Sequence, residues 1–343
     1  MTAGESRMAR EAREAADGAR RQIATCAAAL AELGARLRAS PPAFVVTCAR
    51  GSSDHAATYG KYVLETTVGR LVASVGPSVA STYGRAPIGL ERALVIAVSQ
   101  SGRSPDVLRL TETARAAGAV VVGLINDTTA PLAAVCDVVI PLCAGAETSV
   151  AATKSFLLAA FGFVQLAAAW TQDPALAAAV AAAPDALAAA CALDWTPALA
   201  PLAGATSMYV VGRGVGLGAA AELALKLKET CRLHAEAFST AEVVHGPIAL
   251  VGAGFPILAL GQDDETAAGT RTAVAHLHAL GADVRSALTV AGTTALPTVA
   301  GVAPIIAPLC QVQSFYLAVP ALAAARGLDP DAPPNLRKIT ETV

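Results

Sequence analysis

Residues 93–104 read ALVIAVSQSGRS, and a segment of helical character follows from Pro105. The opening run ALVIAV, rich in β-branched and aliphatic side chains, is typical of a buried strand. Serine hydroxyls and a glycine then follow at once, in a chain that is 54% apolar and only 15% charged. Hydroxyls and free backbone N–H groups at the start of a helix bind anions. The stretch therefore predicts a strand, an anion-binding turn and a helix, in that order.

Similar apolar runs alternate with helix-length segments along the chain, which is typical of parallel βαβ units. We expect strands near residues 44, 70, 93, 119 and 136, and again near 207, 255, 282 and 303. Aligning Gly51 with Gly214 places VTCARGSS against YVVGRGVG and SQSG against QDDE. We therefore expect a duplicated α/β chain, with a helical segment over residues 1–40, one domain over 41–180, a connection over about 171–203 and a second domain over 200–343.

Composition excludes several classes of protein. The formal net charge of −2 and the isoelectric point near 6.2 leave no basic field, so no nucleic acid or membrane partner is expected. Seven scattered cysteines, without a CxxC pair or clustered histidines, predict reduced thiols in a cytoplasmic protein that has no metal site. The N-terminal residues alternate acids and arginines, unlike a signal peptide. Residues 155–172 predict a buried helix, and 286–325 a turn, a short strand and a helix.

The polar loops after the expected strands differ between the two halves. The first half offers six donors, Ser52, Ser53, Ser99, Gln100, Ser101 and Ser104. The aligned loop of the second half carries Asp263, Asp264 and Glu265, and carboxylates repel a phosphate. A single serine at a helix start is more often only a cap. Two such loops on neighbouring parallel strands favour a ligand site, so we expect one phosphate site per chain.

The expected helix from about residue 221 holds reactive candidates. Glu222, Lys226 and Glu229 are spaced by four and three, so they share one face of a helix. The alternative is a solvated ion pair. The chain has five lysines against twenty arginines, which suggests that the amine chemistry of a retained lysine matters. His245 lies beside a turn in VVHGP, where a catalytic and a structural role are equally plausible.

A nucleotide cofactor is not expected. The stretch GRGVGLG has Leu217 where the dinucleotide fingerprint needs its third glycine. These glycines predict a tight turn from strand to helix.

Several segments together resemble a known family. They are CARGSSDH, SQSGRSPD, GAETSVAATKSF, ELALKLKETCRLHAEAFSTAEVVHGPIAL and the terminal PPNLRKITETV. From about Met8 to Val343 the chain is similar to the isomerase half of glucosamine-6-phosphate synthase, which consists of two SIS (sugar isomerase) domains. The resemblance implies two flavodoxin-like, doubly wound parallel sheets, each a three-layer α/β/α domain, packed in a homodimer.

The resemblance also implies roles for individual residues. The phosphate would be held by Ser53, Ser99, Gln100, Ser101 and Ser104, and the sugar by Ser52 and the backbone near Val150. Glu229 matches the family's proton carrier between C1 and C2, and Lys226 a lysine close to the ring oxygen and O1. His245 matches a ring-opening acid or base that reaches in from the partner protomer. Lys338 matches a C-terminal lysine that can form an imine with the open sugar.

The function implied is the interconversion of an amino sugar phosphate and a keto sugar phosphate, without cofactor or metal. The glutaminase part of the synthase has no counterpart here, so we expect no amidotransfer from glutamine by this chain. A glucosamine-6-phosphate deaminase, which yields fructose 6-phosphate and ammonia, fits best. Three alternatives stay open: a fructosamine-6-phosphate deglycase, a synthase that receives ammonia from a separate protein, and a non-catalytic sugar-phosphate sensor.

Overall fold

The computed structural model describes residues 5–338, so the ends of the first and last expected segments, 1–4 and 339–343, lie outside it. The described chain divides into two compact units. We call Asp17–Glu147 with Lys154–Pro184 the first unit. The second unit comprises residues 5–16, Thr148–Thr153 and Asp185–Lys338.

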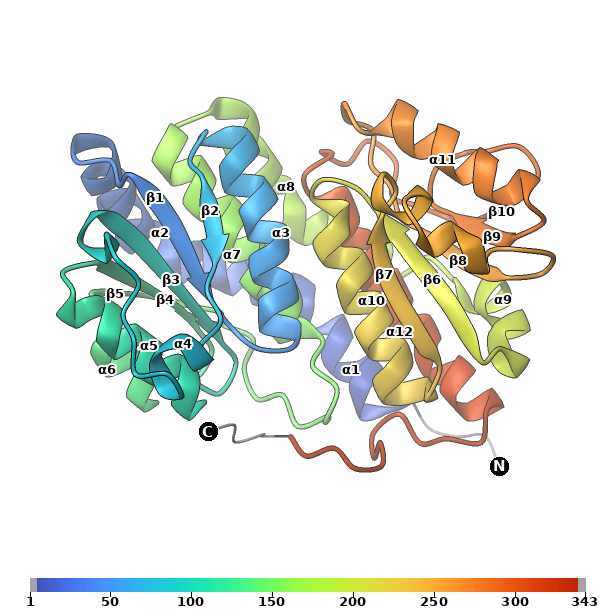
Figure 1. Cartoon of the computed structure of the whole chain (residues 1–343), viewed down its shortest axis with the longest axis horizontal. Helices are drawn as coiled ribbons and strands as arrows, with labels where there is room; N and C mark the ends of the chain where they lie inside the picture. The colour runs from blue at the N-terminus through green and yellow to red at the C-terminus, as the bar shows by residue number, and fades with distance from the viewer. Residues whose placement is uncertain (1–4, 339–343) are drawn as a thin grey trace. The chain divides into compact units, whose positions relative to one another are not determined.

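The first unit contains a parallel sheet of five strands in the order β2-β1-β3-β4-β5. Every residue of β3 is buried, as expected for a parallel sheet covered on both faces. Helices α3 and α7 pack together on one side, and α5 and α6 cover the other (Figure 1). Its elements, of which α2 and α8 each extend past the bounds of the unit, are α2 (Ala15–Ala39), β1 (Phe44–Cys48), α3 (Ser52–Thr67), β2 (Val72–Ser74), α4 (Ser78–Ser81), η1 (Leu90–Arg92), β3 (Ala93–Ser99), α5 (Pro105–Ala116), β4 (Val120–Ile125), α6 (Pro131–Val135), β5 (Val138–Pro141), α7 (Lys154–Thr171) and α8 (Pro174–Ala190).

The second unit repeats this topology. Its parallel sheet has the order β10-β9-β8-β6-β7, in which β6 lies between β7 and β8 as β1 lies between β2 and β3. The elements are α1 (Arg7–Arg13), α9 (Thr196–Leu199), η2 (Ala200–Gly204), β6 (Ser207–Gly212), α10 (Gly216–Cys231), β7 (His234–Ser239), η3 (Glu242–Val244), η4 (Pro247–Leu250), β8 (Pro256–Ala259), α11 (Ala267–Ala279), β9 (Asp283–Ser286), β10 (Thr294–Ala295) and α12 (Ala307–Ala325). The strand order is that of flavodoxin-like sheets, so the predicted fold class is confirmed.

The aligned glycines Gly51 and Gly214 explain how each first strand turns into its helix. Both have positive φ angles, 56° and 58°, in a region that residues with a side chain rarely adopt. Helix α3 begins directly after Gly51, and α10 begins two residues after Gly214. Each turn is therefore tight enough to leave the start of its helix at the carboxyl edge of the sheet.

The predicted strands differ from the structure in three places, because one expected strand is absent and the edge strands β7 and β10 were not expected. The apolar run near residue 303 is not a strand, because turns there lead into α12 at Ala307. Strand β7 was not expected because its residues alternate between polar and apolar at an edge of the sheet, where only one face is covered. The run near residue 303 is as apolar as a buried strand but is interrupted by Pro304 and Pro308, whereas β7 alternates in polarity.

The long apolar helices are core helices of the chain. Among the described residues, α7 and α12 are long and apolar enough to cross a membrane by length and composition. In the fold, 83% of α7 and 78% of α12 are buried. Such burial is what a core helix shows, and it agrees with the helices expected in these two stretches.

Because several thiols are buried, the stability of the fold should fall at alkaline pH. Burial raises the pKa of Cys26, Cys48, Cys136 and Cys310 to about 12, from an ordinary 9.0. Above pH 9 the unfolded chain therefore loses protons that the folded chain keeps, so stability falls between pH 9 and 12. We expect a declining Tm from pH 9 to 11 in thermal melts, with a shallower decline in Cys48→Ala. Parallel curves for both proteins would contradict this prediction.

Candidate active site

The predicted phosphate ligands of the first unit follow the carboxyl ends of two central strands of its sheet. Ser52 and Ser53 are the first residues of α3, directly after β1, and Ser104 is the N-cap of α5, shortly after β3. Strands β1 and β3 are hydrogen-bonded neighbours whose connections lead in opposite directions. Their carboxyl ends form the switch point of the sheet, where open α/β sheets bind ligands.

Two serines shape the turn between β3 and α5. The Ser99 hydroxyl oxygen accepts from the Gly102 N–H at 2.9 Å, and that of Ser101 accepts from the Arg103 N–H at 3.3 Å. Gly102 has a φ of 63°, and an added Cβ would lie 2.6 Å from the Cβ of Ala130. The turn therefore requires glycine. Accepting a bond leaves each hydroxyl able to donate its own proton to a ligand.

The arginines beside these loops are paired with carboxylates. Arg50 follows β1, and its Nε donates to Oδ2 of the buried Asp106 of α5 at 2.8 Å. Its Nη2 lies 2.6 Å from the same oxygen. This ion pair joins the two predicted phosphate loops. Arg103 lies 3.0 Å from Asp127, and bonds from Thr129 and Arg103 hold the pKa of Asp127 below its ordinary value. A phosphate here would depend mainly on neutral donors.

Three charged residues on α10 of the second unit, Glu222, Lys226 and Glu229, form a largely buried row, whereas Lys228 on the same helix is exposed. Lys226 is fully buried, and its Nζ lies 2.5 Å from Glu229 Oε2 and 3.4 Å from Glu222 Oε1. Tyr316 of α12 donates its hydroxyl to Glu222 at 2.7 Å. The Glu229 side chain is 19% exposed, whereas that of Glu222 is completely buried. The expected shared face is confirmed, and the alternative of a solvated ion pair is wrong.

The C-terminal segment lies beside the exposed end of this row. Pro334, Asn335 and Leu336 line a depression together with Glu229 and neighbouring residues of α10. Lys338 follows two residues after Leu336 and is half-buried. The structure thus brings the segment that carries Lys338 to the same depression as Glu229.

His245 stands apart from this row. It is exposed at the end of η3, and within residues 5–338 no hydrogen bond or ion pair joins it to Glu229 or Lys226. The turn after it is fixed, because the Tyr209 hydroxyl donates to the carbonyl of Pro247 at 2.9 Å. Phe255 packs edge-on against the Tyr209 ring.

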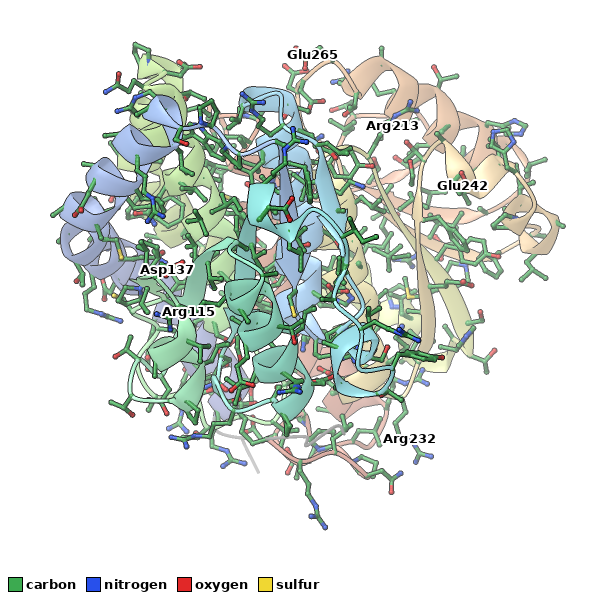
Figure 2. All side chains as sticks on the ribbon, turned by 60° about the vertical axis from the view of Figure 1, so that its left-hand side comes forward. Arg115, Asp137, Arg213, Arg232, Glu242 and Glu265 are labelled. Atoms are coloured by element: carbon green, nitrogen blue, oxygen red, sulfur yellow. The ribbon has the colours of Figure 1, made fainter. Side chains whose placement is uncertain are left out.

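In the acidic loop of the second unit, Asp263 and Asp264 contact residues of the loop itself and of the helix that follows it. Asp264 accepts from the N–H of Thr266 at 2.8 Å, just before α11, and Asp263 lies 3.6 Å from Arg271. Glu265 is exposed on the same loop (Figure 2).

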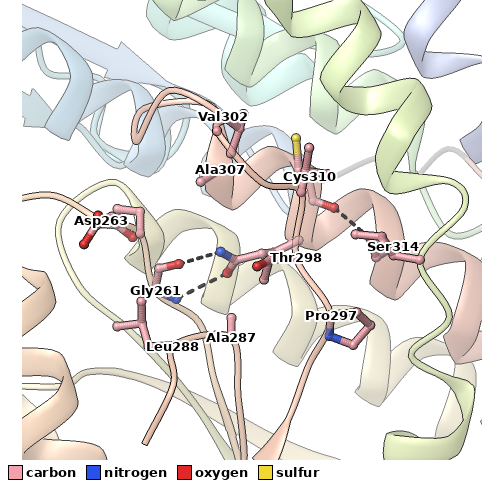
Figure 3. A pocket seen from close by; sticks show the side chains of 15 residues that line it. Gly261, Asp263, Ala287, Leu288, Pro297, Thr298, Val302, Ala307, Cys310 and Ser314 are labelled. Carbon is pink, nitrogen blue, oxygen red and sulfur yellow. Dashed lines mark hydrogen bonds between the residues drawn. The ribbon is translucent and has the colours of Figure 1, made fainter.

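The neighbouring Gly261 lines a cavity of about 220 Å³, and the side chain of Gln311 bonds to both its N–H and its carbonyl (Figure 3). Both backbone groups of Gly261 are therefore hydrogen-bonded within the protein, whereas an anion site needs N–H groups that can donate to the ligand.

Two features of the site were not expected from the sequence. The bond from Tyr316 to Glu222 joins residues 94 positions apart, and no local pattern marks it. Val150 lies in Thr148–Thr153, whose first two N–H groups bind the carboxylate of Glu11.

No three His, Cys, Asp or Glu side chains of residues 5–338 cluster as a metal site would require.

The fold defines a class, the doubly wound α/β proteins, in which ligands collect at sheet switch points. The sequence profile of the SIS domain matches residues 44–169 and 201–318. The chain belongs to the SIS domain family, with two copies of the domain.

Relatives extend this assignment. The glutamine–fructose-6-phosphate aminotransferase (isomerizing) of Aeropyrum pernix is 35% identical over 314 residues, which are 84% of this chain and 49% of that protein. The chain thus spans about half the length of the curated relatives it matches.

A solved structure from Silicibacter pomeroyi DSS-3, provisionally described as a phosphosugar isomerase, is 42% identical with a TM-score of 0.90. It covers 95% of this chain and 100% of its own. Glucosamine-6-phosphate deaminase from Thermotoga maritima has a TM-score of 0.77 at 20% identity, which shows likeness of fold over 98% of this chain and 100% of that one.

The Arg50 to Asp106 ion pair can be tested by substitution. Arg50→Ala should lower the free energy of unfolding by about 1–3 kcal/mol, because the buried Asp106 carboxylate loses a charged partner. Arg109→Ala removes an exposed arginine 3.7 Å from Glu112 and should cost less than about 0.5 kcal/mol. Urea unfolding of both variants measures the difference. Equal losses would show that Asp106 does not need Arg50.

Proposed function

We propose that this chain is an amino sugar phosphate isomerase of the deaminating type. It would convert glucosamine 6-phosphate and water into fructose 6-phosphate and ammonia. The observation that carries the proposal is the buried row on α10, which ends in the partly exposed carboxylate of Glu229. The aminotransferase relative at 35% identity supports the substrate class, a hexose 6-phosphate.

The first unit has the role of holding the phosphate. Ser53, Ser99, Gln100, Ser101 and Ser104 are the ligands in the proposal. Neutral donors at a helix start suit a dianion, and the arginines nearby already have carboxylate partners. Ser52 and the backbone at Val150 would bind the sugar hydroxyls.

The second unit has the role of moving protons. His245 opens the pyranose ring, and Glu229 then removes the proton from C2 to give an enolamine. The proton returns at C1, which leaves an imine at C2. Water adds to that imine, ammonia departs, and the ketone of fructose 6-phosphate remains. One base that reaches both carbons suffices for the shift, and Glu229 is the carboxylate of the row that is open to solvent.

The two lysines have different roles in the proposal. Lys226 is buried against two carboxylates, so it keeps Glu229 in place and contributes positive charge near the ring oxygen and O1. Lys338, on the C-terminal segment beside the Glu229 depression, can form an imine with the open-chain carbonyl. His245 is exposed next to Val244 and near Leu250, two apolar residues that are also exposed. These features support a homodimer in which His245 serves the partner's site.

The central test is ammonia release from glucosamine 6-phosphate. Wild-type protein should release ammonia and fructose 6-phosphate in equal amounts. Glu229→Gln should lower kcat by about 10²- to 10⁴-fold, because a glutamine cannot accept the C2 proton. Fructose 6-phosphate should still bind to it, as isothermal titration calorimetry can show.

The matched control is Glu265→Gln, which neutralises an exposed carboxylate of the same unit and should leave turnover unchanged. Full activity in Glu229→Gln would remove Glu229 from its role. Turnover of fructosamine 6-phosphate adducts in place of glucosamine 6-phosphate would identify a deglycase instead.

A further inference from the structure

Helix α1 makes two carboxylate-to-backbone contacts with segments that are remote in sequence. One contact is made by Glu11, which accepts bonds from the loop at Thr148 and Ser149. The other is made to its N-terminus by Asp331, in the C-terminal segment. All of these residues belong to the second unit. In the proposed function, these two segments carry Val150 and Lys338.

The Glu11 contact is buried and multiple. Its Oε1 accepts from the N–H and the hydroxyl of Thr148 at 2.6 and 2.8 Å, and its Oε2 accepts from the N–H of Ser149 at 3.1 Å. Glu11 is only 7% exposed, so the carboxylate is largely removed from water. Bonds from N–H groups to a buried carboxylate are strong and directional. They fix the backbone directly before Val150.

The Asp331 contact closes the start of α1. Its two oxygens accept from the N–H groups of Arg7 and Met8 at 2.7 and 2.9 Å, across 324 and 323 positions of sequence. Arg7 also donates a side-chain bond to the carbonyl of Asp331 at 3.1 Å. A carboxylate at a helix N-terminus is favoured by the helix dipole. Lys338 follows seven residues later, after the Pro334–Leu336 stretch beside Glu229.

The helix itself is anchored to the core of its unit. Met8, Ala9 and Ala12 are buried, and Gln313 of α12 donates to the carbonyl of Ala12 at 3.0 Å. Helix α12 also supplies Tyr316, the partner of Glu222. Helix α1 is thus fixed to α12, the element that also supports the charged row of α10.

We propose that α1 is a two-ended clamp, in which Glu11 positions the sugar-binding loop at Val150 and Asp331 positions the segment that bears Lys338. Glu11 and Asp331 are positioning residues, because both act through backbone that they hold. This role rests on the proposed function, whereas the clamp as a structural device can be measured without it.

Amide hydrogen exchange tests the clamp independently of activity. In Glu11→Ala, the amides of Thr148 and Ser149 should exchange at least about tenfold faster, because they lose charged acceptors. In Asp331→Ala, the amides of Arg7 and Met8 should do the same. Arg10→Ala, an exposed substitution on the same helix, should change neither pair. Unchanged exchange in either acid variant overturns the clamp at that end.

Kinetics with glucosamine 6-phosphate test the positioning. Glu11→Ala should raise KM about tenfold with little change in kcat, since it disturbs sugar binding, and Glu11→Gln should recover part of the loss through its remaining acceptor oxygen. Asp331→Ala should lower kcat about tenfold at a nearly constant KM. Glu32→Gln, on the exposed side of α2, is the matched control for loss of a carboxylate.

A double-mutant cycle separates positioning from general destabilisation. If Asp331 acts by placing Lys338, then Asp331→Ala should have less than about a twofold further effect on kcat in a Lys338→Ala background. Additive losses would overturn its positioning role. If wild-type protein shows no turnover while the exchange results are as expected, the proposed function fails and the structural clamp stands.

Discussion

The buried ammonium of Lys226 is the constraint on which the site depends. A lysine removed from water carries a large desolvation cost, and only nearby opposite charge can offset it. Glu222 and Glu229 supply that charge from one turn before and one turn after on the same helix. Glu222 is in turn bonded by Tyr316, so its carboxylate is fixed inside, whereas that of Glu229 is partly exposed. The position of the exposed carboxylate is therefore set by the buried part of the row.

The two halves of the chain use one topology for different chemistry. Each sheet has its switch point after a first strand that turns through a glycine with positive φ. In the first unit the loops at this point carry hydroxyls and an amide. In the second unit the corresponding loop carries acids, and Asp264 bonds to the start of α11. The two units thus share one framework, while their loops differ in charge.

The sequence was sufficient to predict what depends on local pattern. Strands buried on both faces are continuous apolar runs, and residues three and four apart on a helix meet, so most strands and the charged face of α10 were predicted. What could not be predicted depends on distant pairing. The contacts of Asp331 with Arg7 and of Tyr316 with Glu222 leave no trace in spacing or composition. The edge strand β7 was missed because its polar alternation resembles that of other surface segments.

The dependence of the site on the buried Lys226 ammonium is tested most directly by a double-mutant cycle on Glu222 and Lys226, measured by urea unfolding. Lys226→Met should lower the free energy of unfolding by about 3–5 kcal/mol, because Glu222 remains as a buried and uncompensated charge. The double variant Glu222→Gln with Lys226→Met should be distinctly more stable than Lys226→Met alone, because the buried charges are removed together. Wild-type stability in Lys226→Met, or a double variant less stable than either single one, would contradict the account.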